Sequence, residues 1–417
     1  MQGAGCFPDT AVLTVVFGPG VRDGATCGKS RLCFLGHVGY NQGMETIKLL
    51  KRLIAARPTA EEGELGAARV LADYFEANGL ACRVDVWDEK RANATVRVAS
   101  GGDRPGLLLA AHLDVVPPGE AAWKYPPFEP TEADGRIYGR GAADMKGGLV
   151  AAATAIVEVV KSGAVLQGDI VFTAVAGEET DSSGAMRFVD QYRRDLAGKL
   201  AGVVICEPTK FDVVTAHRGI LWLQITTAGK TAHGSMPHLG INAILKMNRL
   251  LNRLEGFRIP HMPHPLLGGC SMSVNRIDGG KATNVIPDRC TIEVDVRTLP
   301  GMDHETVTGE FQKLFEAIRA DDPQFKARTS VLRSSPALET DPAAPFVRSV
   351  LEITGIEKTA TVGFTTDGPH FVPLNAPIII YGPGDPAICH QPDEYIEIAA
   401  VEEARRHYRR IIERFLT

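Results

Sequence analysis

Apolar residues recur with a helical period in the segment that follows Met44. One apolar stripe ends before Pro58 and consists of Ile47, Leu50, Leu53 and Ile54. A second helical pattern, over residues 65–77, stops at Asn78-Gly79, a pair that favours the end of a helix. Both segments are therefore predicted to be amphipathic helices.

The next part of the chain alternates between short apolar runs and a long helical segment. The pattern predicts strands over residues 82–86, 107–111, 170–176 and 203–206, and a buried helix over residues 146–160 that is rich in Ala and Val. The run at 107–111 is apolar throughout, as in strands buried on both faces. Buried strands that alternate with helices predict an α/β fold, with helices on both faces of a mainly parallel sheet.

After Arg218-Gly219 the pattern changes. Strands with alternating apolar positions fit residues 221–227, 272–277 and 290–296, and a last strand fits residues 326–332. Helices fit residues 242–254 and 305–318. The resulting order, β-α-β-β-α-β, is that of a ferredoxin-like, split βαβ unit.

The α/β pattern resumes near residue 335. A compact domain over residues 218–334 is therefore predicted to be inserted into a larger host domain, which consists of residues 44–217 and 335–417. Two domains are also expected because a chain of 417 residues is long for a single hydrophobic core.

Residues 1–43 are rich in Gly and show no sustained period, so a disordered leader or an over-extended start is expected there. Residues 11–17 resemble the apolar core of a signal peptide, but Asp9 precedes them and no Lys or Arg does. Gly24 and Gly28-Lys29-Ser30 resemble a phosphate-binding loop, but they are one residue short of the G-x-x-x-x-G-K-[ST] spacing. Neither feature is taken as functional.

Composition describes an ordinary globular protein, with 44% apolar and 23% charged residues. Lys and Arg total 45 against 50 Asp and Glu, and no basic stripe appears, which argues against nucleic acid or anionic membrane partners. No apolar run approaches the roughly 20 residues that a bilayer span needs. The eight Cys residues show no CxxC pairing, which favours reduced thiols and a cytoplasmic location.

The first candidate for chemistry is His112-Leu113-Asp114, which directly follows the apolar run at 107–111. It lies at the carboxyl end of a predicted buried strand, where ligands of open α/β sheets bind. In an extended chain His112 and Asp114 point the same way, so Asp114 can accept the second ring N–H of His112 and raise its basicity as a metal ligand. Alone, such a motif is more often a strand-end His paired for structure.

Asp144 lies in a Gly-rich turn, residues 139–148, that leads into the predicted buried helix. The turn fails the dinucleotide pattern G-x-G-x-x-G because Asp144 occupies the last Gly position. A carboxylate on such a turn can bridge two cations through its two oxygens, and Lys146 nearby would tune the local field.

Acidic residues follow two further predicted strands. Glu178-Glu179 comes after the strand at 170–176, and Glu207 comes after the strand at 203–206. Two adjacent carboxylates that are buried without compensation cost several kcal/mol, so one is expected to be a metal ligand and the other a proton shuttle. Alone, Glu178-Glu179 would more often be a solvated strand end. Together with His112, however, these residues gather at one edge of the sheet.

Two more His residues lie outside these strand ends. His390 occurs in His390-Gln-Pro-Asp-Glu, in a loop after a predicted strand at residues 378–381. His233 belongs to the predicted inserted domain, in a loop before a helix. Without the other residues, His390 would be an ordinary surface His and His233 a turn residue.

In this order, the segments resemble the dinuclear zinc aminoacylase and carboxypeptidase family that includes acetylornithine deacetylase, succinyl-diaminopimelate desuccinylase and glutamate carboxypeptidase. The resemblance covers essentially all residues from Met44 to the C-terminus. Glu207 resembles the peptidase and deacylase branch, since related ureidohydrolases tend to have His there. The segment from Gly382 through His390 resembles the acetylornithine deacetylase group most, whereas residues 1–43 have no counterpart in the family.

The resemblance implies a zinc-peptidase-like host domain with two Zn²⁺ ions, which Co²⁺ or Mn²⁺ could replace. It implies that His112, Asp144 and Glu207 hold one ion, that Asp144, Glu179 and His390 hold the other, and that Glu178 is the general base. It further implies a homodimer, in which the inserted domain presents His233 to the site of the partner subunit.

A substrate carboxylate would need an anchor. Arg297, on an alternating strand of the inserted domain, could form a bidentate clamp or, as an alternative, a salt bridge with Asp295 or Glu293. The resemblance favours the substrate role, together with Asn284 and Gly363.

The leading hypothesis is metal-dependent hydrolysis of an N-acyl L-amino acid or a related small amide. A dipeptidase or carboxypeptidase would use the same site. A nucleotide-binding module fits poorly because both Gly-rich stretches fail their spacings. A metal-binding protein without catalysis would not need Glu178, which is present.

Overall fold

The computed structural model describes residues 31–417, with side chains from residue 43 onward. Gly43–Thr417 forms one compact unit. Helix α1 (Arg31–Ala55) begins before Met44, where the hydrophobic pattern placed its start. No proline interrupts residues 31–43, so the backbone can continue the helix without an apolar period. The expectations for residues 1–30, including the sequence that resembles a phosphate-binding loop, lie outside the described residues.

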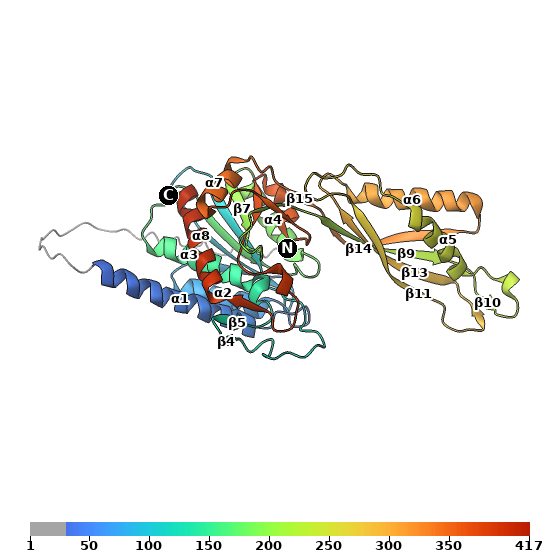
Figure 1. The fold of residues 1–417 in the computed structure, drawn as a ribbon, viewed down its shortest axis with the longest axis horizontal. Helices are drawn as coiled ribbons and strands as arrows, with labels where there is room; N and C mark the ends of the chain where they lie inside the picture. Colours follow the sequence, from blue (N-terminus) through green and yellow to red (C-terminus); the bar gives the residue numbers. More distant parts are fainter. Residues whose placement is uncertain (1–30) are drawn as a thin grey trace, which may run out of the picture. The chain divides into compact units, whose positions relative to one another are not determined.

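A central sheet carries the larger part of the fold (Figure 1). Its strands lie in the order β1 (Cys82–Val86), β2 (Ala92–Val98), β6 (Ile170–Val175), β3 (Gly106–His112), β7 (Leu200–Ile205), β17 (Ile378–Ile380), β8 (Val214–His217) and β15 (Leu338–Glu339), and β16 (Ala360–Val362) pairs with β8. The middle pairs, β6 with β3, β3 with β7 and β7 with β17, are parallel, whereas β1, β2 and β15 pair in antiparallel fashion. The predicted α/β fold with a mainly parallel central sheet is confirmed, in a mixed form with antiparallel edges.

Alternate residues of the middle strands face two separate hydrophobic cores. Leu107, Leu109 and Ala111 belong to the core that includes side chains of helices α2 (Leu65–Ala77), α3 (Gly147–Lys161), α7 (Pro345–Thr354) and α8 (Ile398–Leu416). Leu108 and Ala110 belong to the core formed with α4 (Ser183–Leu196) and the short helix η3 (Gly368–Leu374). Because both faces are covered, β3 is buried along its whole length, as its apolar run predicts.

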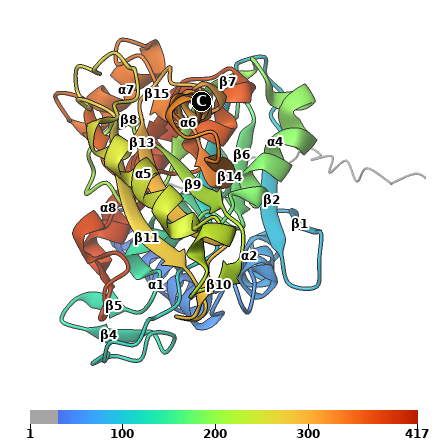
Figure 2. The same ribbon diagram turned by 90° about the vertical axis from the view of Figure 1, so that its right-hand side faces the viewer.

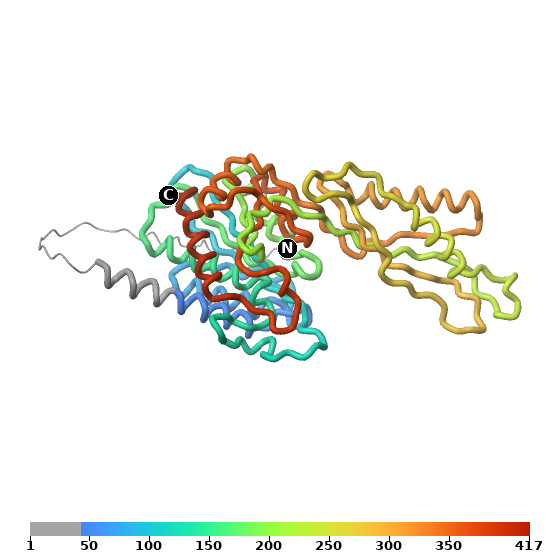
Figure 3. Tube along the Cα trace, viewed as in Figure 1, coloured from blue at the N-terminus to red at the C-terminus, as the bar shows by residue number. Residues whose placement is uncertain are grey.

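A second sheet lies between β8 and β15 in the sequence, and we call residues 219–335 the two-layer segment (Figures 2 and 3). Its elements are β9 (Gly219–Ala228), α5 (Ala243–Gly256), β11 (Ser271–Gly279), β13 (Arg289–Thr298), α6 (His304–Asp321) and β14 (Lys326–Ser335). The strands lie in the order β11-β13-β9-β14 with antiparallel neighbours. The strand faces formed by Leu223 and Val294 pack against α5 and α6 residues such as Leu250 and Phe311.

Two small sheets complete the described strands. One pairs β10 (Ala232–His233) with β12 (Val285–Ile286). The other joins β18 (Tyr395–Glu397), β5 (Arg136–Tyr138) and β4 (Thr131–Ala133), and it brings a segment near the C-terminus beside the turn that carries Asp144. Among the described helices, none combines the length and the hydropathy of a membrane span.

Candidate metal centre

The parallel strands β6, β3 and β7 end at one edge of the central sheet. His112 is the last residue of β3, Glu178 and Glu179 follow β6, and Glu207 follows β7. Because β3 pairs with both neighbours in parallel, these three ends lie next to each other. The structure therefore brings together the strand-end residues that the sequence singles out.

Asp144 approaches this edge from the turn before α3. Gly141 precedes it with a φ of 82°, a left-handed conformation that favours Gly. Asp144 Oδ1 lies 3.1 Å from His112 Nε2, and Glu207 Oε1 lies 3.6 Å from the same nitrogen. We call His112, Asp144 and Glu207 the inner group.

His390 approaches the other oxygen of Asp144. Its Nε2 lies 3.3 Å from Asp144 Oδ2 and 2.9 Å from Glu179 Oε1. Asp144 thus directs one carboxylate oxygen to each imidazole. We call Asp144, Glu179 and His390 the outer group, because the side chain of His390 is 47% exposed and that of His112 only 1%.

The carboxylate of Asp114 has partners besides the predicted one, His112. The Nδ1 atom of His112 lies 3.0 Å from the main-chain carbonyl oxygen of Asp114 and 3.6 Å from its carboxylate, so the carbonyl is the nearer acceptor. The carboxylate instead accepts hydrogen bonds from the amides of Gly177, Glu178 and Glu179, at 2.9, 3.1 and 3.0 Å. The turn after β6 leaves these amides without strand partners, and the buried Asp114 carboxylate satisfies them. The ring of His112 is thus held by Asp114 through its backbone carbonyl.

The charges in this cluster strongly perturb one another. Burial raises the pKa of Glu178 and Glu207 well above the usual range, and their neighbouring carboxylates add to the shift. Burial opposes the charge on His112, but Glu207, Asp114 and Asp144 outweigh it and raise the pKa of the imidazole. Hydrogen bonds to Asp144 and Glu179 raise the pKa of His390 to about 10. Without a bound cation, each further carboxylate charge in this cluster is therefore costly.

The donor set fits a pair of divalent cations. In the inner group, and likewise in the outer group, the donor atoms lie within 4.8 Å of one another, and a further group combines His112 with Glu178 and Glu179. Imidazole and carboxylate donors suit Zn²⁺ and its neighbours in the first transition series. Since an uncompensated set of buried carboxylates is costly, bound cations would relieve the repulsion within the cluster.

The remaining predicted site residues lie in or near other elements. His233 is exposed on β10, and its Nδ1 lies 2.7 Å from Ser235 Oγ. Arg297, on β13, pairs with Asp295 at 3.0 Å, which is the alternative that the sequence left open. Asn284 is exposed and its carbonyl accepts the amide of Gly234, and Gly363 is exposed beside the end of β16. The predicted catalytic and substrate roles of these residues stay predictions.

Several polar residues near the centre were not predicted from the sequence. Asp367 is 3% exposed, and neither of its carboxylate oxygens has a hydrogen-bond partner among the described residues. Burial raises its pKa to about 7. It lines a small hollow together with His112 and Glu207. In this loop the sequence singled out Gly363 and not Asp367, because an isolated Asp-Gly pair indicates a turn and nothing more.

Arg140 and Glu394 form a second set of residues that the sequence did not single out. Their side chains are 2% and 0% exposed and make an ion pair of 2.6 Å. Arg140 belongs to the same Gly-rich turn as Asp144, and Glu394 to the same loop as His390. Both residues lie within motifs that the sequence singled out for Asp144 and His390. The spacing of a motif, however, does not show which of its charged residues become buried.

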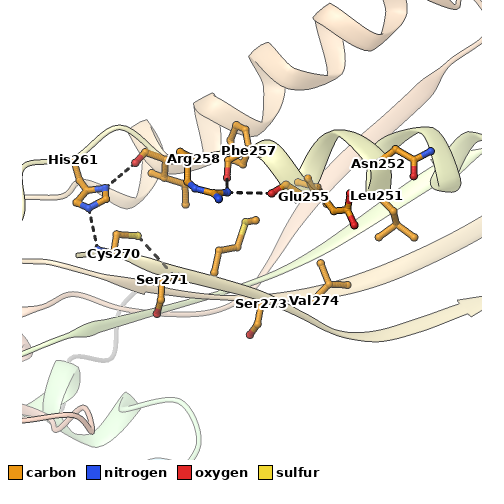
Figure 4. Close-up of a pocket in the computed structure, with 13 residues that line it drawn as sticks. Leu251, Asn252, Glu255, Phe257, Arg258, His261, Cys270, Ser271, Ser273 and Val274 are labelled. Atoms are coloured by element: carbon orange, nitrogen blue, oxygen red, sulfur yellow. Dashed lines mark hydrogen bonds between the residues drawn. The ribbon is translucent and has the colours of Figure 1, made fainter. Parts of the chain in front are cut away.

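A larger cavity lies elsewhere, in the two-layer segment (Figure 4). It has a volume of about 640 Å³ and lies between the end of α5 and the start of β11. His261 contributes to its wall and is held by the carbonyl of Ile259 and the amide of Cys270. None of the predicted site residues lines it, so size alone does not identify the chemical site in the described part of the chain.

Known proteins resemble this chain over most of its length. The family model described as "Peptidase family M20/M25/M40" matches residues 108–414. A probable succinyl-diaminopimelate desuccinylase of Staphylococcus aureus is 31% identical over 389 residues, covering 85% of this chain and 93% of the relative. An acetylornithine deacetylase of Myxococcus xanthus is 31% identical over 347 residues, covering 82% and 88%.

Solved structures show the same fold. The M20 family metallo-carboxypeptidase Sso-CP2 from Sulfolobus solfataricus superimposes with a TM-score of 0.73 at 18% identity, covering 88% of this chain and 98% of that one. The YXEP protein of Bacillus subtilis, described as a dinuclear metal binding peptidase from the M20 family, gives a TM-score of 0.68 at 16% identity, covering 89% and 98%. At these identities the likeness concerns the fold alone.

Proposed function

The chain belongs to the M20/M25/M40 peptidase family, and from that premise we propose that it is a metal-dependent amide hydrolase that removes the acyl group from a small N-acyl L-amino acid. The observation that carries this proposal is the pair of ligand groups that share Asp144 directly beside Glu178. The names of the desuccinylase and deacetylase relatives point to the same substrate class.

The inner group would hold one Zn²⁺ and the outer group the other, with Asp144 as the shared ligand. Co²⁺ and Mn²⁺ fit the same donors. A pair of such ions, when bound, supplies Lewis-acid chemistry: it lowers the pKa of water and polarises a carbonyl oxygen. The name of the dinuclear Bacillus subtilis protein supports two ions rather than one.

Glu178 is the proposed general base. Its side chain is buried, and hydrogen bonds hold both its backbone amide and its backbone carbonyl. Asp114 accepts its amide at 3.1 Å, and Arg333 donates to its carbonyl oxygen at 2.8 Å. Held in this way, Glu178 would accept a proton from the attacking water and return it to the leaving amine, which contributes about 10²- to 10⁴-fold to the rate.

His233 and Arg297 are proposed to act on the substrate. His233 of one subunit would donate a hydrogen bond to the developing oxyanion in the site of the other, a contribution worth about 3 kcal/mol. Its exposure on β10 leaves the ring accessible for that contact. Arg297 would exchange its ion pair with Asp295 for the carboxylate of the substrate, with Asn284 and Gly363 completing the pocket.

A homodimer through the two-layer segment is part of the proposal. Strand β11 lies at the edge of its sheet, so its outer backbone groups can pair with another strand. Leu245 on α5 and Ile277 on β11 are 61% and 59% exposed, which offers apolar surface near that edge. We also propose a cytoplasmic location, which the free thiols of the described Cys residues support.

A dipeptidase or carboxypeptidase is the second candidate. The same donors and Glu178 would hydrolyse a peptide bond, and the resemblance in fold to the carboxypeptidase Sso-CP2 keeps this candidate open. The two differ only in what surrounds the scissile bond, so the pocket decides between them.

A substrate panel tests the proposal. N-acetyl and N-succinyl amino acids are assayed against dipeptides, with protein loaded with Zn²⁺ or Co²⁺ and with an EDTA-treated control. We expect turnover of acyl amino acids that EDTA abolishes and added metal restores. Turnover confined to dipeptides would establish the second candidate, and turnover that survives complete metal removal would refute both.

A further inference from the structure

The pairing of β5 with β18 joins two distant parts of the chain beside the metal centre. Tyr138 pairs with Tyr395, and the amide of Gly139 donates to the carbonyl of Glu394 at 2.9 Å. Arg140 follows β5 and Glu394 precedes β18, so this pairing brings their side chains together. Both are fully buried, and their ion pair of 2.6 Å spans 254 residues of sequence.

Glu394 contacts the backbone that carries Asp144. Its Oε2 binds Arg140, and its Oε1 accepts the amides of Ala143 and Asp144 at 3.0 and 3.2 Å. A buried carboxylate that accepts main-chain amides fixes the position of that backbone. Glu394 therefore determines where the Asp144 turn lies.

Arg140 contacts the backbone that carries His390. Its Nη2 donates to the carbonyl of His390 and its Nη1 to the carbonyl of Gln391, each at 3.3 Å. His390 has a φ of 65°, a left-handed conformation that a residue with a Cβ adopts only when its surroundings hold it there. The ring of Trp123 covers the guanidinium, with the Cζ atom 4.9 Å from the ring centre.

One ion pair thus connects the backbone segments that carry Asp144 and His390, two of the three residues of the outer group. Neither Asp144 nor His390 lies on a strand of the central sheet, whereas His112 ends β3 and Glu207 follows β7 after Cys206. The sheet itself fixes two ligands of the inner group, His112 and Glu207. The spacing of 3.3 Å between Asp144 Oδ2 and His390 Nε2 depends instead on the contacts of the two loops.

We infer that Arg140 and Glu394 are positioning residues that set the distance between Asp144 and His390, and that the outer group holds its ion only while this pair is intact. The inference rests on the proposed two-ion centre. It predicts a larger effect on the outer ion, because disruption of the pair leaves His112 and Glu207, the strand-borne ligands of the inner group, in place.

Two conservative substitutions in the full-length chain test it. Glu394→Gln keeps the shape of the side chain and an oxygen for the amides, but it removes the charge that faces Arg140. Arg140→Lys keeps the positive charge but lacks the planar fork that reaches Glu394 and two carbonyls together. We expect wild type to hold two Zn²⁺ per chain and both variants to hold one, with an affinity for the second ion that is about 10- to 100-fold weaker.

Zinc content after equilibrium dialysis and isothermal titration with zinc alone provide the readout, so activity is not needed. The matched control is Glu158→Gln, which breaks the buried pair of Glu158 on α3 with Arg405 on α8, away from the ligand loops. Circular dichroism checks that each variant is folded, and the control should hold two ions.

Two ions at wild-type affinity in both Glu394→Gln and Arg140→Lys would overturn the inference and leave the proposed function intact. Equal loss of the second ion in Glu158→Gln would also overturn it, since the effect would then follow from general destabilisation. A wild-type chain that holds one ion at most would instead refute the two-ion centre itself, and that measurement precedes the others.

Discussion

The inner and outer ligand groups share Asp144, yet the chain builds them differently. His112 and Glu207 are positioned by neighbouring parallel strands, and their side chains are 1% and 5% exposed. His390 comes from a loop, its backbone is left-handed, and its side chain is 47% exposed. The hydrogen-bonded sheet therefore positions His112 and Glu207, whereas contacts between loops position His390.

This difference teaches how rigidity is distributed at the centre. Strand ends of a buried sheet open only when the fold opens, whereas loop residues exchange with solvent through local motions that cost little free energy. The strand-end ligands His112 and Glu207 should therefore be coupled to global stability, and the loop ligand His390 to local loop contacts. Substitutions at the centre can test this separation.

The largest effect is expected at the ligand common to both groups. Asp144→Asn removes the carboxylate that faces both imidazoles at 3.1 and 3.3 Å, so both ions should be lost and turnover should fall below detection. Zinc analysis and the acyl amino acid assay measure the two outcomes together. Retention of one tightly bound ion would show that the groups do not depend on a shared ligand.

A large loss of rate without loss of metal is expected at Glu178. Glu178→Gln should lower kcat by about 10²- to 10⁴-fold, because the amide cannot accept the proton of the water. Zinc content should stay at the wild-type value, whereas the neighbouring Glu179→Gln should lose the outer ion. Glu178 could also bind a metal ion together with His112 and Glu179. A fall in zinc content in Glu178→Gln would therefore show that Glu178 is a metal ligand.

The two imidazoles should differ in their effect on the metal-free protein. His112→Ala leaves a buried gap and an unpaired carbonyl, which should lower the free energy of unfolding by about 1–3 kcal/mol. His390→Ala removes a half-exposed ion pair and should cost less than about 1 kcal/mol. Denaturant titration in EDTA gives both values, and equal losses would contradict the distinction between the groups.

The sequence predicts the residues at the strand ends well for a physical reason. The end of an apolar run indicates the end of a buried strand, and a polar residue at that point must lie at the edge of the sheet. That logic located His112, Glu178 and Glu207. It also predicted that the Asp114 side chain points toward His112. It did not predict that the amides of residues 177–179 compete with His112 for the Asp114 carboxylate.

His390 could not be derived in this way. Strands β5 and β18 are short and show no alternation, so nothing in their pattern reveals that they pair. Without that pairing, the burial of Arg140 against Glu394 is invisible, and so is the reason for the position of His390. His390 entered the prediction through its motif and the family resemblance, not through periodicity.

The smallest effect expected is a difference in affinity between the two ions of the wild-type protein. Because His390 is half exposed and held by loop contacts, the outer ion should dissociate more readily, with a Kd at least about tenfold higher than that of the inner ion. Titration with a chromogenic chelator should resolve two steps. His390→Ala shows which step belongs to which ion, since this variant should retain only the tighter step. If the ion that remains in this variant instead leaves with the weaker constant, the strand-borne ligands do not form the tighter site, and the sheet confers no advantage on the group it positions.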